Sequence, residues 1–167
     1  MYELKPMTPG GVSAALAKAE RYRLLNEPEA AESIGLDILS IDPQNQTALV
    51  TLLLARTDLI ARGMGGAVTK AREVLPRLAE EYDRAYYAGI INERRGHAQM
   101  LSPSMGAAAL AHDWFTEAME CFERAEAIRP EGNDDAVLRW NSCARLLNAH
   151  PEIAPRHEDE HQVVLDD

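Results

Sequence analysis

The sequence predicts an all-α domain, on the strength of three observations. Of its 167 residues, 46% are hydrophobic but only 5% are aromatic, so the core must be built from small side chains on closely packed helices. Apolar residues recur at the helical period in seven stretches, and no stretch is a convincing strand. A segment covering residues 26–45 is also matched by a second one at 113–132. We therefore expect one helical domain, long enough to bury a core.

The first three helices are expected between residues 11 and 61. Residues 11–26 carry one apolar stripe at the helical period, formed by Leu16, Ala19, Tyr22 and Leu25. A second helix opens at Pro28, because proline is tolerated in a first turn, and closes at Asp42 and Pro43. The stretch 47–61 is almost continuously apolar, which favours a helix that is buried on two sides.

Four further helices are expected after a glycine-rich turn. Gly63, Gly65 and Gly66 end the third helix, and this run lacks the lysine and hydroxyl residue of a phosphate-binding loop. The later helical patterns cover residues 67–80, 82 to about 100, 113–128 and 133–148.

Comparison of the chain with itself indicates a repeated helical hairpin. The two matching segments align Asn26 with Asp113, Ala31 with Ala118, Ile38 with Ala125 and Pro43 with Pro130. Each is preceded by an amphipathic helix with a small residue near its middle, Ala19 or Gly89, where two helices approach closely.

This hairpin resembles the tetratricopeptide repeat (TPR), in which a W-x2-L-G-x2-Y helix is followed by A-x3-F and a closing proline. The first repeat matches at Ala19, Tyr22, Ala31 and Pro43, and the third at Gly89, Gly96, Ala118, Phe122, Ala125 and Pro130. The middle repeat is degenerate, with Leu52, Leu53, Ala67 and Ala71 in consensus positions and Ala79 in place of the closing proline.

The resemblance divides the chain into three parts. These are an N-terminal extension (1–11), a TPR-like domain (12–149) and an acidic flexible tail (150–167). Within the domain we expect repeats at about 12–45, 46–81 and 82–132, and a capping helix at 133–149. The third repeat carries an insertion near 97–112, which is either an adaptable contact surface or an extended helix, a turn and an early start of the next helix.

The resemblance implies a right-handed superhelical solenoid with a concave groove that binds a segment of a partner protein, and implies no chemistry. Projecting the inward positions of the first helices gives an apolar candidate groove of Leu16, Glu20, Val50, Leu54, Tyr86, Tyr87, Ile90, Glu93, Val137 and Asn141. These side chains either contact a partner or pack against neighbouring helices.

One subclass of the family holds the C-terminal carboxylate of chaperones with a basic clamp. The corresponding positions here are Leu16, Glu20, Thr51, Asp83 and Tyr87. They supply two acids and no cation, so binding of a chaperone tail is not expected.

Charge, hydropathy and cysteine content limit the partners and the cellular compartment that we expect. With 17 Lys and Arg against 27 Asp and Glu, the net charge of −10 repels nucleic acid and anionic membranes. No apolar run reaches the roughly 18 to 20 residues that span a bilayer, and the chain does not start with a signal pattern. Cys121 and Cys143 lie in helical stretches and fit a reducing compartment. We expect a cytoplasmic protein.

The residues from His157 to His161 match the H-E-x-x-H pattern of zinc proteases. A catalytic zinc needs a rigid helix and a third ligand, whereas this motif follows Pro155 in an acidic tail. We therefore expect no enzyme activity, cofactor or metal site.

The sequence is interpreted as a non-enzymatic adaptor or scaffold with a protein or peptide partner, and a homo-oligomer is left open. One alternative is a cytoplasmic TPR-type chaperone for secreted proteins, a class that is also short, acidic and built from three repeats. A remote alternative is a metal-binding protein that uses the tail histidines.

Overall fold

The computed structural model describes residues 2–64 and 66–155, and within them the chain is helical with no strand. The all-α prediction is confirmed, and the seven expected α-helices are present in these residues. They are α1 (Val12–Leu24), α2 (Pro28–Ile41), α3 (Gln46–Ile60), α4 (Ala67–Arg72), α5 (Glu81–Met100), α6 (Ala107–Ala127) and α7 (Asp135–Ala149). Two 3₁₀ turns accompany them, η1 (Pro9–Gly11) and η2 (Leu75–Arg77).

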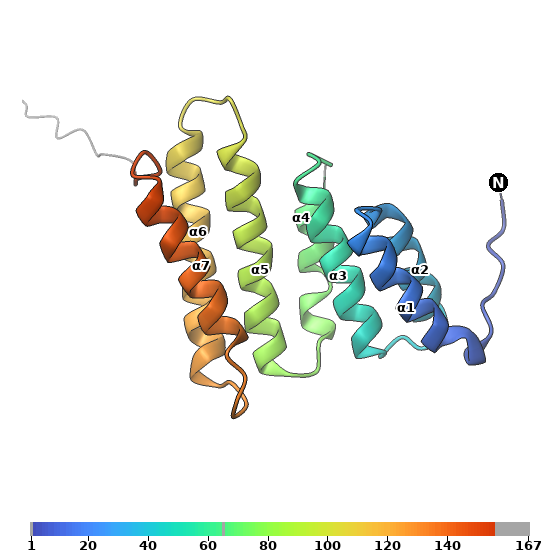
Figure 1. The fold of residues 1–167 in the computed structure, drawn as a ribbon. Coiled ribbons are helices and arrows are strands. Elements are labelled where there is room, and N and C mark those ends of the chain that lie inside the picture. Colours follow the sequence, from blue (N-terminus) through green and yellow to red (C-terminus); the bar gives the residue numbers. More distant parts are fainter. Residues whose placement is uncertain (1, 65, 156–167) are drawn as a thin grey trace, which may run out of the picture.

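The helices stand side by side in chain order, from α1 and α2 at one end to α6 and α7 at the other (Figure 1). Consecutive helices pack together from α1 through α7, and α3 also packs against α1 and α5. No helix in the described residues is long and apolar enough to cross a membrane.

α5 and α6 pack against each other more extensively than the other helix pairs do, and two glycines of α5 permit a close contact between them. A Cβ atom at Gly89 would lie 2.5 Å from the ring of Phe122, and one at Gly96 would lie 2.9 Å from the ring of Phe115. Both rings are almost fully buried. The two rings therefore occupy the space that a side chain on α5 would fill, which confirms the close approach expected at Gly89.

Two apolar clusters form the core, and they meet at α5. Ile91 belongs to the cluster built mainly from α2, α3 and α4. Its neighbour Ile90 belongs to the cluster of α6 and α7. Leu54 and Tyr87 are half-buried and pack against both clusters. The position of α5 therefore couples the two halves of the molecule.

The insertion near 97–112 is mostly helical. α5 continues to Met100 and α6 begins at Ala107, six residues before the expected start at 113. The earlier start is stable because Ala107 and Ala111 are buried. The insertion thus has the extended helix, the turn and the early helix start of the second interpretation, and the connecting loop leaves Leu101 and Met105 exposed.

The helix expected at 67–80 is shorter than predicted. α4 ends at Arg72, and the chain passes through η2 before it turns into α5. Pro76 lies in η2, where it lacks the N–H that a continuing α-helix needs. The structure contains the glycine-rich turn expected before α4. Gly63 and Gly66 adopt φ values of +68° and +79° there, which glycine tolerates because it has no side chain.

Part of the expected tail belongs to the folded domain. Ile153 is buried in the second cluster, and its N–H donates to the carbonyl of His150 at 2.9 Å. The sequence pattern missed this contact because Ile153 is the one large apolar residue between two prolines.

We predict that Gly89→Ala destabilises the protein. Alanine favours helix formation by about 1 kcal/mol, but overpacking of a filled core costs about 1–3 kcal/mol. Because a Cβ only 2.5 Å from a buried ring puts the cost at the upper end of that range, the net loss in the free energy of unfolding should be about 2 kcal/mol, measured by urea denaturation. Gly10→Ala is the control, since a Cβ at Gly10 meets nothing within 4 Å. Adding Phe122→Leu should recover part of the loss. An equal effect at Gly10 and Gly89 would contradict the close-packing explanation.

Candidate partner-binding groove

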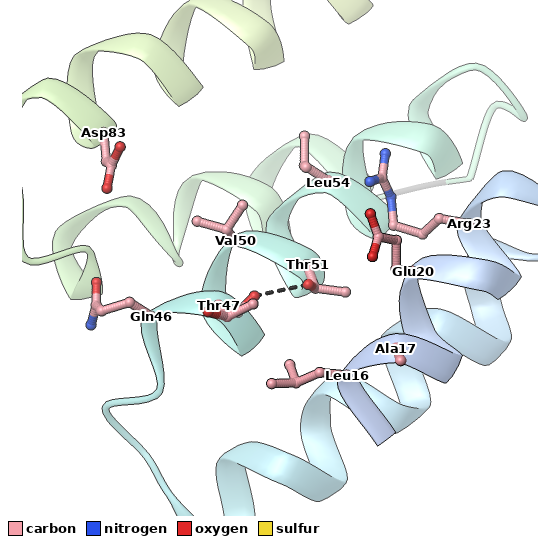
Figure 2. A pocket seen from close by; sticks show the side chains of 10 residues that line it. All are labelled: Leu16, Ala17, Glu20, Arg23, Gln46, Thr47, Val50, Thr51, Leu54 and Asp83. Atoms are coloured by element: carbon pink, nitrogen blue, oxygen red, sulfur yellow. Dashed lines mark hydrogen bonds between the residues drawn. The ribbon is translucent and has the colours of Figure 1, made fainter. Parts of the chain in front are cut away.

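A hollow with a volume of about 560 Å³ lies between α1, α3 and α5. We call it the main hollow (Figure 2). Its lining residues are Leu16, Ala17, Glu20, Arg23, Gln46, Thr47, Val50, Thr51, Leu54 and Asp83.

Helical spacing explains why these side chains meet. On α3, Thr47, Thr51 and Leu54 are separated by four and three residues, which places them on one face of the helix. On α1, Leu16, Glu20 and Arg23 have the same spacing. The hydroxyl of Thr51 donates to the carbonyl of Thr47 at 2.8 Å, so it is satisfied within its own helix.

Two acids in the main hollow have no ion-pair partner among the described residues, namely Glu20 and Asp83. Burial and the nearby Glu80 raise the pKa of Asp83 above its usual value. Arg23 is already neutralised, because its Nε donates to Asp58 at 3.0 Å. The hollow therefore has unbalanced negative charge beside an apolar floor.

Four of the ten predicted groove residues meet in the main hollow: Leu16, Glu20, Val50 and Leu54. Thr51 and Asp83, which the sequence marked as clamp positions, lie there too. Ala17, Arg23, Gln46 and Thr47 were not predicted. Gln46 bridges elements, since its side-chain oxygen accepts from Ala79 N–H at 2.8 Å, and no sequence pattern indicates that contact.

Ile90 does not line the groove. It is 2% exposed and belongs to the second core cluster, so the prediction for this residue is wrong. The projection failed because α5 packs against helices on both sides, whereas the projection assumed one open face.

Tyr86 and Tyr87 are half-buried and belong to an aromatic group beside the hollow. Tyr86 stacks on Tyr82 with ring centroids 5.8 Å apart, and contacts Tyr87 edge to face at 5.1 Å. Burial, with Asp83 nearby, raises the pKa of Tyr87 to about 12. Neither Tyr86 nor Tyr87 is among the lining residues of the main hollow.

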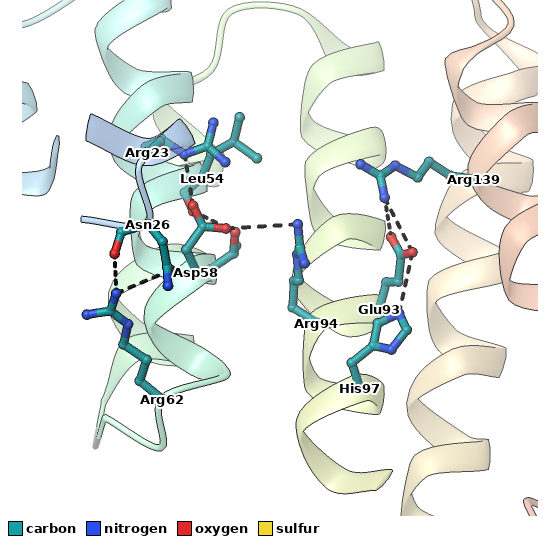
Figure 3. Close-up of polar contacts among 10 residues, drawn as sticks. Arg23, Asn26, Leu54, Asp58, Arg62, Glu93, Arg94, His97 and Arg139 are labelled. Atoms are coloured by element: carbon teal, nitrogen blue, oxygen red, sulfur yellow. Dashed lines mark hydrogen bonds and ion pairs between the residues drawn. The ribbon is translucent and has the colours of Figure 1, made fainter. Parts of the chain in front are cut away.

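Glu93 is buried rather than presented to a partner. Its side chain is 5% exposed, and both carboxylate oxygens lie 3.4 Å from Nη1 of Arg139 on α7. His97 approaches the same carboxylate at 3.9 Å (Figure 3). Burial lowers the pKa of Arg139, but Glu93 and Tyr86 outweigh this and raise it overall. Glu93 therefore ties α7 to α5, and its assignment to the groove is wrong.

Val137 and Asn141 lie elsewhere, in a hollow of about 260 Å³ shared with Glu123, Glu126 and Trp140. None of these residues lines the main hollow. The predicted groove is thus divided between two places.

The two cysteines are buried and unpaired, as expected for core residues. Burial, with Glu93 nearby, raises the pKa of Cys143 to about 12, so this thiol does not ionise at neutral pH. Residues 2–64 and 66–155 contain no group of three His, Cys, Asp or Glu side chains that could hold a metal ion. The motif from His157 to His161 lies outside the described residues.

We predict that Arg139→Met destabilises the protein by about 2–3 kcal/mol, because it removes the arginine from the buried Glu93 carboxylate and leaves it only the more distant His97 ring, at 3.9 Å. Adding Glu93→Gln should restore part of the stability in urea denaturation. Arg145→Met removes the same charge from an exposed position on α7 and should cost less than about 0.5 kcal/mol. If Arg139→Met proves as mild as this control, Glu93 does not depend on the pairing.

No protein-family model matches this sequence, and neither the comparison with curated proteins nor that with solved structures finds a match.

Proposed function

We propose that the protein is a non-enzymatic interaction module, which binds a segment of a partner protein in the main hollow. The observation that carries the proposal is the combination of an apolar floor with two acids that have no ion-pair partner in the part of the chain that the structure describes, all on α1, α3 and α5. The bound segment presents an apolar side chain and a neighbouring lysine or arginine.

The apolar part of the segment packs on Leu16, Val50 and Leu54, which are half-buried and line the hollow. Val50 and Leu54 lie on the largely buried α3, and Leu16 lies on α1, which packs against α2 and α3, so little ordering is needed on binding. A preformed apolar floor of this kind favours an apolar anchor residue.

The cation of the segment approaches Glu20 or Asp83. Asp83 is partly desolvated and lies near Glu80, which raises its pKa. A partner cation relieves this repulsion and therefore gains more than it would at a fully solvated acid. The chain's own residues 156–167 are a poor occupant, because five acids against one arginine give them a net charge of −4.

The arrangement of the helices in consecutive hairpins supports a TPR-like repeat array, which is part of the same proposal. The hairpins α1 with α2, α3 with α4, and α5 with α6 follow the expected repeats, and the main hollow is formed by the first helix of each. The buried free thiols support a reducing compartment such as the cytoplasm.

The test is a selection from a displayed library of random 12-residue peptides on the immobilised full chain. We expect enriched peptides that carry an apolar residue next to Lys or Arg. Their binding should be lost on Thr47→Arg, which places a bulky cation in the hollow at an exposed position. Glu120→Arg on the exposed surface of α6 adds the same charge elsewhere and should leave binding intact. Enrichment that is equal on wild type and Thr47→Arg would rule the hollow out.

Asp83→Asn should weaken the binding of the selected peptides but stabilise the free protein. Because burial raises the pKa of Asp83, its ionised form is disfavoured in the folded state, so its contribution to stability is lost as pH rises through that pKa. Removing the charge should raise the free energy of unfolding at pH 7 by less than about 1 kcal/mol, since the carboxylate remains partly solvated.

The pH dependence of binding has the opposite sign. Peptide affinity should fall as pH drops towards the pKa of Asp83, because the protonated acid no longer attracts the cation. Fluorescence anisotropy between pH 4 and pH 7 measures this, with Asp37→Asn on the exposed surface of α2 as control. A loss of stability in Asp83→Asn, or an affinity that does not depend on pH, would argue against a cation at this site.

A further inference from the structure

A second hollow continues the groove towards the C-terminal ends of α1 and α3. It has a volume of about 380 Å³ and is lined by Arg23, Leu24, Asn26, Asp58, Ala61 and Arg94. We call it the arginine hollow. Arg23 lines both hollows, so the two hollows adjoin each other.

The charges of the arginine hollow are unbalanced in the opposite sense to those of the main hollow. Arg23 and Arg94 share one carboxylate, that of Asp58 (Figure 3). The distances are 3.0 Å from Nε of Arg23 to one oxygen and 3.9 Å from Nη2 of Arg94 to the other. Two cations and one anion leave one positive charge in excess.

Arg94 is the less satisfied of the two arginines. Its contact with Asp58 is longer than a hydrogen bond, and 38% of its side chain is exposed. A guanidinium has five N–H donors in one plane, arranged to bind a carboxylate through two of them. Arg94 therefore has donors to spare for a second carboxylate.

We propose that the arginine hollow binds an Asp or Glu side chain of the same partner segment whose cation lies in the main hollow. This inference rests on the proposed function and adds to it a charge order along the groove. With Arg23, Arg94 and Asp58 already present, the ligand carboxylate adds a second anion and balances the two cations. The partner is thus a segment with opposite charges at its two ends and an apolar residue between them.

The helices set the spacing between these charges. Asp83 and Arg94 lie eleven residues apart on α5, which is close to three helical turns, so they share one face of the helix. At 1.5 Å per residue the separation is roughly 16 Å along the axis. An extended segment rises about 3.3 Å per residue, so its cation and its carboxylate should lie about five residues apart.

The peptides selected from the 12-residue library also test this inference. We expect an enriched acidic position about five residues from the Lys or Arg. Arg94→Gln should weaken such a peptide about tenfold, the size expected for one charge-assisted hydrogen bond. The same peptide with its acid replaced by alanine should bind wild type and Arg94→Gln equally well. Arg145→Gln serves as the control for net charge.

A second experiment reverses the charge of Arg94 and that of the peptide residue expected to contact it. Arg94→Glu should reject the acidic peptide and accept the version in which lysine replaces the acid. The midpoint of thermal unfolding of each variant, compared with wild type, shows that the fold is kept. Failure to enrich any peptide would overturn both this inference and the proposed function. If Thr47→Arg abolishes peptide binding but Arg94→Gln and Arg145→Gln change the affinity equally, this inference alone is overturned.

Discussion

The close contact of α5 with α6 is the constraint on which the rest of the structure depends. Phe115 and Phe122 are buried where Gly96 and Gly89 have no side chain. Burying a phenylalanine contributes roughly 1.5–3 kcal/mol, and two rings one heptad apart fix both the register and the rotation of α5. Any side chain at Gly89 would push the helices apart and change which residues α5 turns towards α3.

That rotation decides what each face of α5 does. Asp83, Ile91 and Arg94 turn towards α3, where they line the two hollows or complete the first core cluster. Ile90 and Glu93 turn towards α6 and α7 and are buried. Since Glu93 is held by Arg139 of α7, the packing of the last helix also supports α5 and, through it, one wall of the groove.

The charged side chains that hold helices together are different from those that are free to contact a ligand. Arg56 pairs with Glu32, and Arg139 pairs with Glu93, so these charges join helices to one another. Glu20 and Asp83 have no such partner in the described residues, and Arg94 has an incomplete one. In a chain with a net charge of −10, a local excess of positive charge beside an acidic hollow gives the groove a polarity, which is the basis of the proposed order of charges in its ligand.

The sequence by itself determined the all-helical class, most helix positions and the glycine close contact, because these follow from local periodicity, caps and residue size. It also predicted that Leu16, Glu20, Val50 and Leu54 lie together, and they line one hollow, since a spacing of four residues places each pair on one face of its own helix. It misplaced Ile90 and Glu93, since burial of α5 on both sides depends on partners that are distant in the chain. Only the tertiary structure decided the early start of α6, the burial of Ile153 and the meeting of Arg23, Asp58 and Arg94. Each of these depends on contacts between segments that no local pattern relates.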